Sequence, residues 1–113
     1  MHEMSLMQSV LDIIEDASIS GKFTKVKKIC LEIGVLSCVD AGALDFCFDA
    51  VMCGTMAQDA ILEIVKKQGQ GWCVACSKTV EIGERYDPCP FCGGHQIQVT
   101  GGEEMRVKEL EVE

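Results

Sequence analysis

The chain has 113 residues, of which 48% are hydrophobic and 25% charged, and its formal net charge is −8. This length accommodates one small core with at most a satellite module, which argues against a multidomain enzyme. The acidic charge disfavours nucleic acid as a partner, because phosphate backbones are bound through cationic side chains. No apolar stretch approaches the roughly 18 residues of a membrane span, and the first residues lack the basic and apolar regions of a signal peptide. We therefore expect a folded cytoplasmic protein that binds no membrane.

Apolar periodicity predicts two helices and three strands. Apolar residues recur at helical spacing from Leu6 until Gly21 ends the first helix. A second helix is expected after the N-cap residue Asp40, and Gly54 ends it. Alternating or continuous apolar residues predict strands over 26–33, 61–65 and 105–112, the last with a bulge near Lys108. The fold class is therefore α/β or α+β, with a small body of two helices and a three-stranded sheet.

The segment 68–102 differs in composition from the rest of the chain. Glycine becomes frequent, large aliphatic residues become scarce, and four cysteines appear in two close pairs. We interpret it as an inserted module, with the body formed by residues 1–67 and 103–113. About 30 residues are too few to bury a stabilising core, so a metal or disulfides must hold the module together. The glycines at 69–71 and 101–102 are predicted to be hinges.

The two cysteine pairs are Cys73-x-x-Cys76 and Cys89-x-x-Cys92, separated by twelve residues. This spacing resembles that of zinc ribbons, in which two such turns complete a tetrahedral four-sulfur site. A closed sulfur shell makes the expected Zn²⁺ structural and leaves no position for activating water. Two disulfides or scattered core thiols are the alternative. A thioredoxin-like redox pair is disfavoured, because neither pair opens a helix that follows a strand.

The remaining sulfur-containing side chains are expected to pack in the core. Isolated buried cysteines behave as small hydrophobic residues, and methionine fills irregular gaps. We assign this packing role, and no metal chemistry, to two sets of residues. They are Cys30, Cys38, Cys47 and Cys53, and Met4, Met7, Met52 and Met56.

The amino terminus, Met1-His2-Glu3, offers a second donor set. The free amine and the His2 amide nitrogen form a five-membered chelate ring, and the His2 imidazole Nδ1 closes a six-membered ring. Three coplanar nitrogens suit the square-planar preference of Ni(II) or Cu(II). The fourth ligand could be the Glu3 backbone nitrogen, water, or the imidazole of His95. The alternatives are a solvated terminal histidine at position 2 and a surface ring in a turn at position 95.

Several of these residues together resemble the HypA/HybF family of nickel metallochaperones. The resemblance rests on the Met1-His2-Glu3 start and the four ribbon cysteines. It extends to Ser5-Leu6, Leu31-Glu32-Ile33-Gly34 and Gly54-Thr55, and covers essentially the whole chain. Cys38, Cys47 and Cys53 depart from the small or polar residues expected there, which leaves room for additional thiol chemistry.

The resemblance implies a carrier that is not an enzyme. It implies Ni(II) as transferable cargo, delivered during maturation of [NiFe]-hydrogenase and, in some members, to urease. Met1, His2 and Glu3 would bind nickel, with His95 as a further ligand, while Cys73, Cys76, Cys89 and Cys92 would hold zinc. The implied partners are a HypB-type GTPase, the hydrogenase large subunit and a nickel-handling prolyl isomerase. The chain would be a monomer or a weak homodimer.

Two other functions compete with this one. A zinc-ribbon adaptor of transcription or RNA machinery would need a basic surface, and only the cluster Lys25, Lys27 and Lys28 offers one in an acidic chain. A redox enzyme would use the paired thiols. Motifs for nucleotide binding and for catalytic zinc, such as Walker A and H-E-x-x-H, are absent from the sequence.

Overall fold

The computed structural model describes residues 3–113. In this range it has two helices and two three-stranded sheets, and the mixed α and β composition confirms the predicted fold class. The elements are α1 Glu3–Gly21, β1 Val26–Gly34, α2 Ala41–Met52, β2 Ile61–Lys67, β3 Gly69–Cys73, β4 Lys78–Ile82, β5 Ile97–Gly101 and β6 Met105–Val112.

The chain divides into two compact units, which we describe separately. The body unit comprises Met1–Leu31, Val39–Ile64 and Val107–Glu113. The ribbon unit comprises Glu32–Cys38 and Val65–Arg106. No helix of the described part combines the length and apolar character that crossing a membrane requires.

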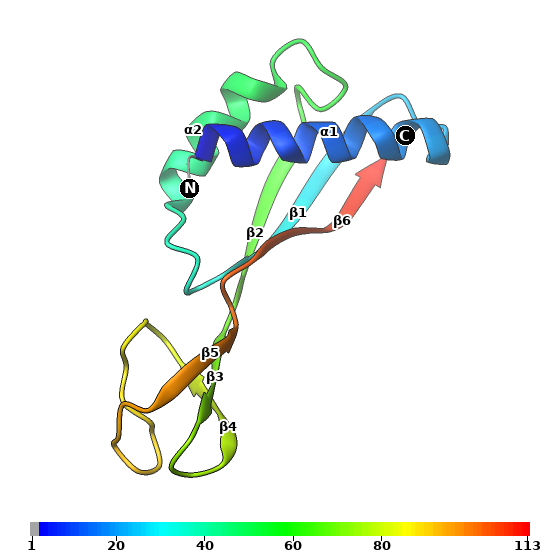
Figure 1. The fold of residues 1–113 in the computed structure, drawn as a ribbon. Coiled ribbons are helices and arrows are strands. Elements are labelled where there is room, and N and C mark those ends of the chain that lie inside the picture. Colours follow the sequence, from blue (N-terminus) through cyan, green and yellow to red (C-terminus); the bar gives the residue numbers. More distant parts are fainter. Residues whose placement is uncertain (1–2) are drawn as a thin grey trace. The chain divides into compact units, whose positions relative to one another are not determined.

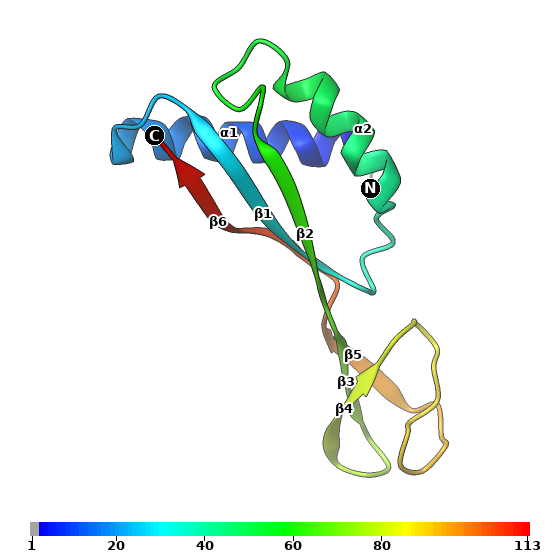
Figure 2. The ribbon, with the colours of Figure 1, turned by 180° about the vertical axis from the view of Figure 1, so that it is seen from behind.

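The sheet of the body has the strand order β2-β1-β6, and α1 crosses one of its faces (Figures 1 and 2). The helix buries Met7, Val10, Leu11 and Ile14, which recur at the spacing of one helical face. The central strand β1 is the most buried of the three and buries Val26, Ile29, Leu31 and Ile33, among others. The five elements predicted from periodicity are thus all present.

Helix α2 begins where the sequence predicted. The Asp40 side chain caps it, because Oδ1 accepts hydrogen bonds from the backbone N–H of Gly42 at 2.9 Å and of Ala43 at 3.4 Å. The helix ends at Met52, and Gly54 follows at φ +79°, a left-handed conformation that glycine adopts without a steric penalty. In β6 the half-buried residues alternate with exposed ones up to Val107. Two successive exposed residues, Lys108 and Glu109, then interrupt the alternation, as a bulge at this position would.

The ribbon unit contains a second sheet with the order β4-β3-β5, whose strands pair antiparallel. The sequence analysis did not predict these strands. Each is only five residues long, and β3 has glycine at positions 69 and 71, so the apolar alternation extends over too few residues to predict a strand. The small core of this unit buries Leu36, Val80 and Ile82 together with Cys73 and Cys89.

The glycines at 69–71 and 101–102, predicted to be hinges, lie in strands or directly after one. Gly69 and Gly71 lie inside β3 and Gly101 ends β5. Their positions require close backbone approach: a Cβ on Gly69 would lie 2.5 Å from the Ile82 carbonyl oxygen. A Cβ on Gly34, at the end of β1, would lie only 2.0 Å from the carbonyl oxygen of Gly102. Glycine is needed here because no side chain fits between these backbones.

The packing role assigned to the isolated sulfur residues is confirmed for some and wrong for others. Cys30, Cys47, Met7 and Met52 are buried. Cys38 and Cys53 are exposed, and Met4 is 46% exposed. Cys38 and Cys53 lie in turns that follow β1 and α2, where the chain leaves the core, so element periodicity did not apply to them.

Candidate metal centre

The four ribbon cysteines come from two turns of the same unit. Cys73 ends β3, and the turn of the β3–β4 hairpin carries Cys76. Ser77, which follows, has φ +52°, so the chain reverses sharply after the second thiol. Cys89 and Cys92 lie in the loop between β4 and β5, and Gly93 at φ +74° turns the chain after them. Both Cys-x-x-Cys segments thus form tight turns that direct two thiols to one point.

The four sulfur atoms lie within 4.8 Å of one another. The Sγ atoms of Cys73 and Cys92 are 3.7 Å apart, and those of Cys76 and Cys89 are 3.9 Å apart. A tetrahedron of thiolates with Zn–S bonds of about 2.3 Å has S···S edges of about 3.8 Å. A disulfide would bring two sulfurs to about 2.05 Å. The spacing therefore fits four thiolates around one cation.

Backbone groups around the second turn support the sulfurs. The N–H of Phe91 donates to Cys89 Sγ at 3.4 Å, and the N–H of Gly94 donates to Cys92 Sγ at 3.5 Å. Two further bonds close the turn, from Cys89 N to the Gly94 carbonyl and from Gly93 N to the Cys89 carbonyl, both at 2.8 Å. Such N–H···S contacts orient thiolates and stabilise their charge.

The metal-free thiols differ in acidity because of these neighbours. The backbone N–H of Cys92, followed by that of Phe91, lowers the pKa of Cys89 to about 6 against the opposing effect of desolvation. The side-chain hydrogen bond with Cys92, with burial second, raises the pKa of Cys76 to about 12. The contacts of the two thiols therefore make Cys89 much more acidic than Cys76.

One contact that the sequence did not reveal joins the two turns. The Lys78 ammonium nitrogen lies 3.5 Å from the centroid of the Phe91 ring, a cation–π arrangement. Lys78 begins β4, directly after the first turn, and Phe91 lies between the two cysteines of the second. The pair therefore links the two halves of the centre from outside. Nothing in local periodicity relates residues that are this far apart in the sequence.

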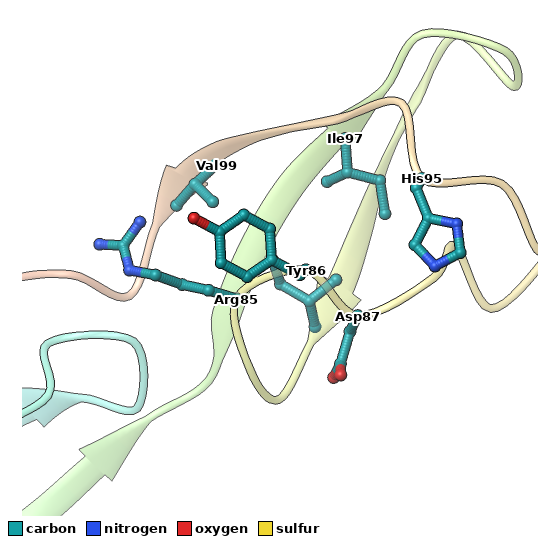
Figure 3. Close-up of a pocket in the computed structure, with 7 residues that line it drawn as sticks. Arg85, Tyr86, Asp87, His95, Ile97 and Val99 are labelled. Carbon is teal, nitrogen blue, oxygen red and sulfur yellow. The ribbon is translucent and has the colours of Figure 1, made fainter.

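The predicted nickel ligands are only partly within the described range. Met1 and His2 lie outside it. Glu3 is the first residue of α1. His95 is exposed in the ribbon unit, where it lines a hollow of about 150 Å³ together with Tyr86 and other residues (Figure 3). Among residues 3–113, the cysteine cluster is the only group of at least three histidine, cysteine or acidic side chains with metal-binding spacing.

Comparison with known proteins places this geometry in context. A family model described as "Hydrogenase/urease nickel incorporation, metallochaperone, hypA" matches residues 1–112. "Hydrogenase maturation factor HypA 2" from Bradyrhizobium diazoefficiens is 58% identical over all 113 residues of both chains. "Hydrogenase maturation factor HypA" from Azotobacter vinelandii is 48% identical over the same length. The solution structure of the Ni metallochaperone HypA from Helicobacter pylori superposes with a TM-score of 0.74 at 27% identity, covering 99% of this chain and 97% of that one.

Proposed function

Because the chain belongs to the HypA family of hydrogenase and urease nickel-incorporation metallochaperones, we propose that it carries Ni(II) at its amino terminus and delivers it to [NiFe]-hydrogenase or urease. The observation that carries the proposal is the Met1-His2-Glu3 start, within a family match that begins at residue 1. A metallochaperone of this kind transfers an ion and catalyses no reaction of its own. Any nucleotide hydrolysis belongs to a partner.

The start of α1 supports Glu3 as a contributor to the nickel site. The first four N–H groups of a helix have no acceptor within the helix. Since Glu3 lies in the first turn of α1, its amide nitrogen has no acceptor within the helix and is available to a metal. The amine of Met1, the amide and imidazole of His2, and the amide of Glu3 would then form a nitrogen set around Ni(II). The imidazole of His95 is the alternative fourth ligand.

The four ribbon cysteines are proposed to hold Zn²⁺ as a structural ion. A closed tetrahedral set of four sulfur donors favours zinc. Nickel is favoured instead by planar nitrogen donors, such as those proposed at the amino terminus. A bound ion of this kind supplies a permanent cross-link and contributes on the order of 10 kcal/mol to folding. The structural ion would thus bind at a different site from the Ni(II) cargo, with Cys73, Cys76, Cys89 and Cys92 as its ligands.

The remaining elements of the proposal follow from the family. A HypB-type GTPase, the hydrogenase large subunit and a prolyl isomerase are the proposed partners, and the cytoplasm is the proposed location. We also propose that the nickel-binding body, residues 1–67 and 103–113, and the ribbon, residues 68–102, act as separate domains. The chain is proposed to be a monomer or a weak homodimer.

Nickel titration of the untagged protein, with zinc measured in the same samples, tests the two sites independently. We expect His2→Ala to lower nickel affinity at least roughly tenfold, because it removes the imidazole donor and the six-membered chelate ring that this donor closes. Zinc content should stay at one ion per chain. A version with two alanines added before Met1 should show the same loss, since its amine no longer lies next to His2. Equal nickel affinity in all three proteins would overturn the amino-terminal site.

A further inference from the structure

Strand β5 is an unusually unprotected sheet edge. It ends the order β4-β3-β5, while the other outer strands, β2, β4 and β6, all carry charged side chains. The sequence of β5, Ile97–Gly101, is IQVTG, without charge or proline. Natural proteins usually guard exposed edges with lysine, proline or other charged residues, because an open edge pairs readily with another chain. This edge lacks those residues.

The pairing register shows which backbone groups of β5 are directed outward. The N–H of Val74 donates to the Gln96 carbonyl at 2.9 Å, and Trp72 lies opposite Gln98. Hydrogen-bonded and non-hydrogen-bonded pairs alternate along an antiparallel ladder. The N–H and C=O groups of Ile97 and Val99 therefore point away from β3. A bulge between Gln70 and Gly71 interrupts the register beyond Val99, so the regular open edge ends there.

The side chains of the same two residues border the hollow. Ile97 and Val99, with Ile82 of β4, provide its apolar part (Figure 3). Its volume of about 150 Å³ is comparable to that of a cavity that accepts one benzene ring. The hollow therefore suits a single aliphatic side chain. Its polar lining consists of Arg85, Tyr86, Asp87 and His95.

The loop that forms this lining is held in shape before any ligand binds. Asp87 Oδ2 accepts hydrogen bonds from the N–H groups of Gly83 at 3.2 Å and Glu84 at 3.0 Å. Within this loop Tyr86 is 91% exposed and has φ +69°, a conformation that costs energy for a bulky residue. A preformed loop next to an open edge lowers the entropic cost of binding.

The charges beside the edge are mainly negative. The loop 83–88 at the hollow and Glu103, which pairs with it, contain three acidic residues, Glu84, Asp87 and Glu103, and one basic residue, Arg85. Arg85 forms an ion pair with Glu103. A segment carrying lysine or arginine is complementary to this surface. A second copy of the chain, also with a net charge of −8, is not.

We propose that the outer edge of β5 docks an extended, lysine- or arginine-bearing segment of a partner protein. The segment adds as a further strand, hydrogen-bonded to the backbone of Ile97 and Val99, and places one aliphatic side chain in the hollow. Strand addition of this type obtains affinity from main-chain hydrogen bonds and specificity from pockets for alternate side chains. Of the proposed nickel ligands, His95 lines this hollow.

The first test uses the full-length, zinc-loaded protein and a capped peptide of alternating lysine and valine. Amide resonances assigned by NMR should shift at Ile97 and Val99. Three control peptides replace valine by serine, replace lysine by glutamate, or methylate the valine amides. Each should bind at least roughly fivefold more weakly, because it removes the apolar side chain, the charge complementarity or the ladder donors, respectively. Equal binding of the N-methylated peptide, or shifts confined to other residues, would overturn the proposal.

The second test changes the protein. Val99→Pro removes an outward N–H without removing a bond to β3, which an edge strand tolerates. Val99→Ala is the matched control, since it shortens the side chain but keeps the N–H. We expect Val99→Pro to bind the peptide roughly tenfold more weakly than Val99→Ala, with zinc content unchanged in both. Equal affinities would contradict the proposal. A second outcome would also contradict the proposal: the wild type binds no peptide but self-associates, and Val99→Pro abolishes this self-association. The edge of β5 would then pair two copies of the chain. If Val99→Pro loses zinc, the N-methylated peptide decides.

Discussion

The isolated thiols differ strongly in their environment. Burial, with the nearby Glu63 carboxylate second, raises the pKa of Cys30, whose Sγ lies 3.7 Å from Glu63 Oε1. Cys38 and Cys53 are exposed. Because the thiolate is the reactive form, iodoacetamide near neutral pH should modify Cys38 and Cys53 in the zinc-loaded protein and leave Cys30 unmodified. Peptide mass spectrometry measures this, with urea-unfolded protein as the control in which Cys30 reacts. Modification of Cys30 in the folded protein as fast as of Cys53 would contradict it.

The acidities of the ribbon thiols predict how zinc loading depends on pH. With a pKa of about 12, Cys76 must give up a proton whenever zinc binds, so zinc affinity falls as the solution becomes more acidic. Cys89, with a pKa of about 6, is already deprotonated above that pH. Only below about pH 6 does zinc binding also have to release the proton of Cys89. The logarithm of the zinc affinity should therefore fall more steeply below about pH 6 than above. Competition with a chromophoric chelator measures the slope, and a constant slope would show that Cys89 has an ordinary acidity.

At the level of the elements, the close approach of β1 to the chain after β5 predicts a large effect for a small substitution. A Cβ on Gly34 would lie 2.0 Å from the carbonyl oxygen and 2.2 Å from the carbonyl carbon of Gly102. Backbone atoms cannot rotate away, so Gly34→Ala should lower the free energy of unfolding by about 1–3 kcal/mol or more. Gly21→Ala is the control, because the nearest atoms there, at 3.2 Å and 3.4 Å, belong to the mobile ring of Phe23. Urea unfolding of both zinc-loaded variants gives the comparison; equal losses would refute the steric explanation.

Elements that bury a long periodic face were predictable from the sequence. The 19 residues of α1 and the 9 of β1 present enough apolar repeats to identify the type of both elements and the end of α1, whereas the start of α1 was placed three residues too late, at Leu6 instead of Glu3. Strands β3 to β5 were missed because each has only five residues, and in β3 glycine takes two of the three inward positions, so the alternation covers too few residues to stand out. The glycines at 69–71 suggested flexibility. In the structure, glycine is required at position 69 because the backbone of the neighbouring strand leaves no room for a side chain. That information is tertiary and is not present in local sequence.

Within the candidate site, the thiol cluster could be predicted because ligand spacing alone restricts the geometry of a Cys-x-x-Cys turn. The contact between Lys78 and Phe91, and the hollow beside β5, could not. Both depend on how the two cysteine turns and the loop around Tyr86 fold onto one sheet. The nickel ligands Met1, His2 and His95 remain predictions, as does the role of zinc.

At the scale of the whole molecule, the two units have different sources of stability. The body buries long aliphatic side chains from two helices and a sheet, among them Met7, Ile14, Leu31 and Met52. The ribbon buries only a few apolar side chains beside the cysteines. Removing the metal with a chelator should therefore abolish the dispersed amide resonances of residues 69–101, while the helical circular dichroism of α1 and α2 persists. Readdition of zinc should restore the resonances. Loss of both signals together would mean that the units unfold as one.

The sulfur pairs have a further consequence for how this chain tolerates changes in length. Cys73 and Cys92 are 19 positions apart, and Cys76 and Cys89, enclosed by them, are 13 apart. A metal bound by these four thiols would close two concentric loops, and the cost of closure rises only logarithmically, by about 0.6 kcal/mol for each doubling of loop size. Insertions between the two cysteine turns should therefore reduce the stability of the four-cysteine centre only slightly. We therefore expect the segment between Cys76 and Cys89 to accept added residues while the four thiols keep their spacing.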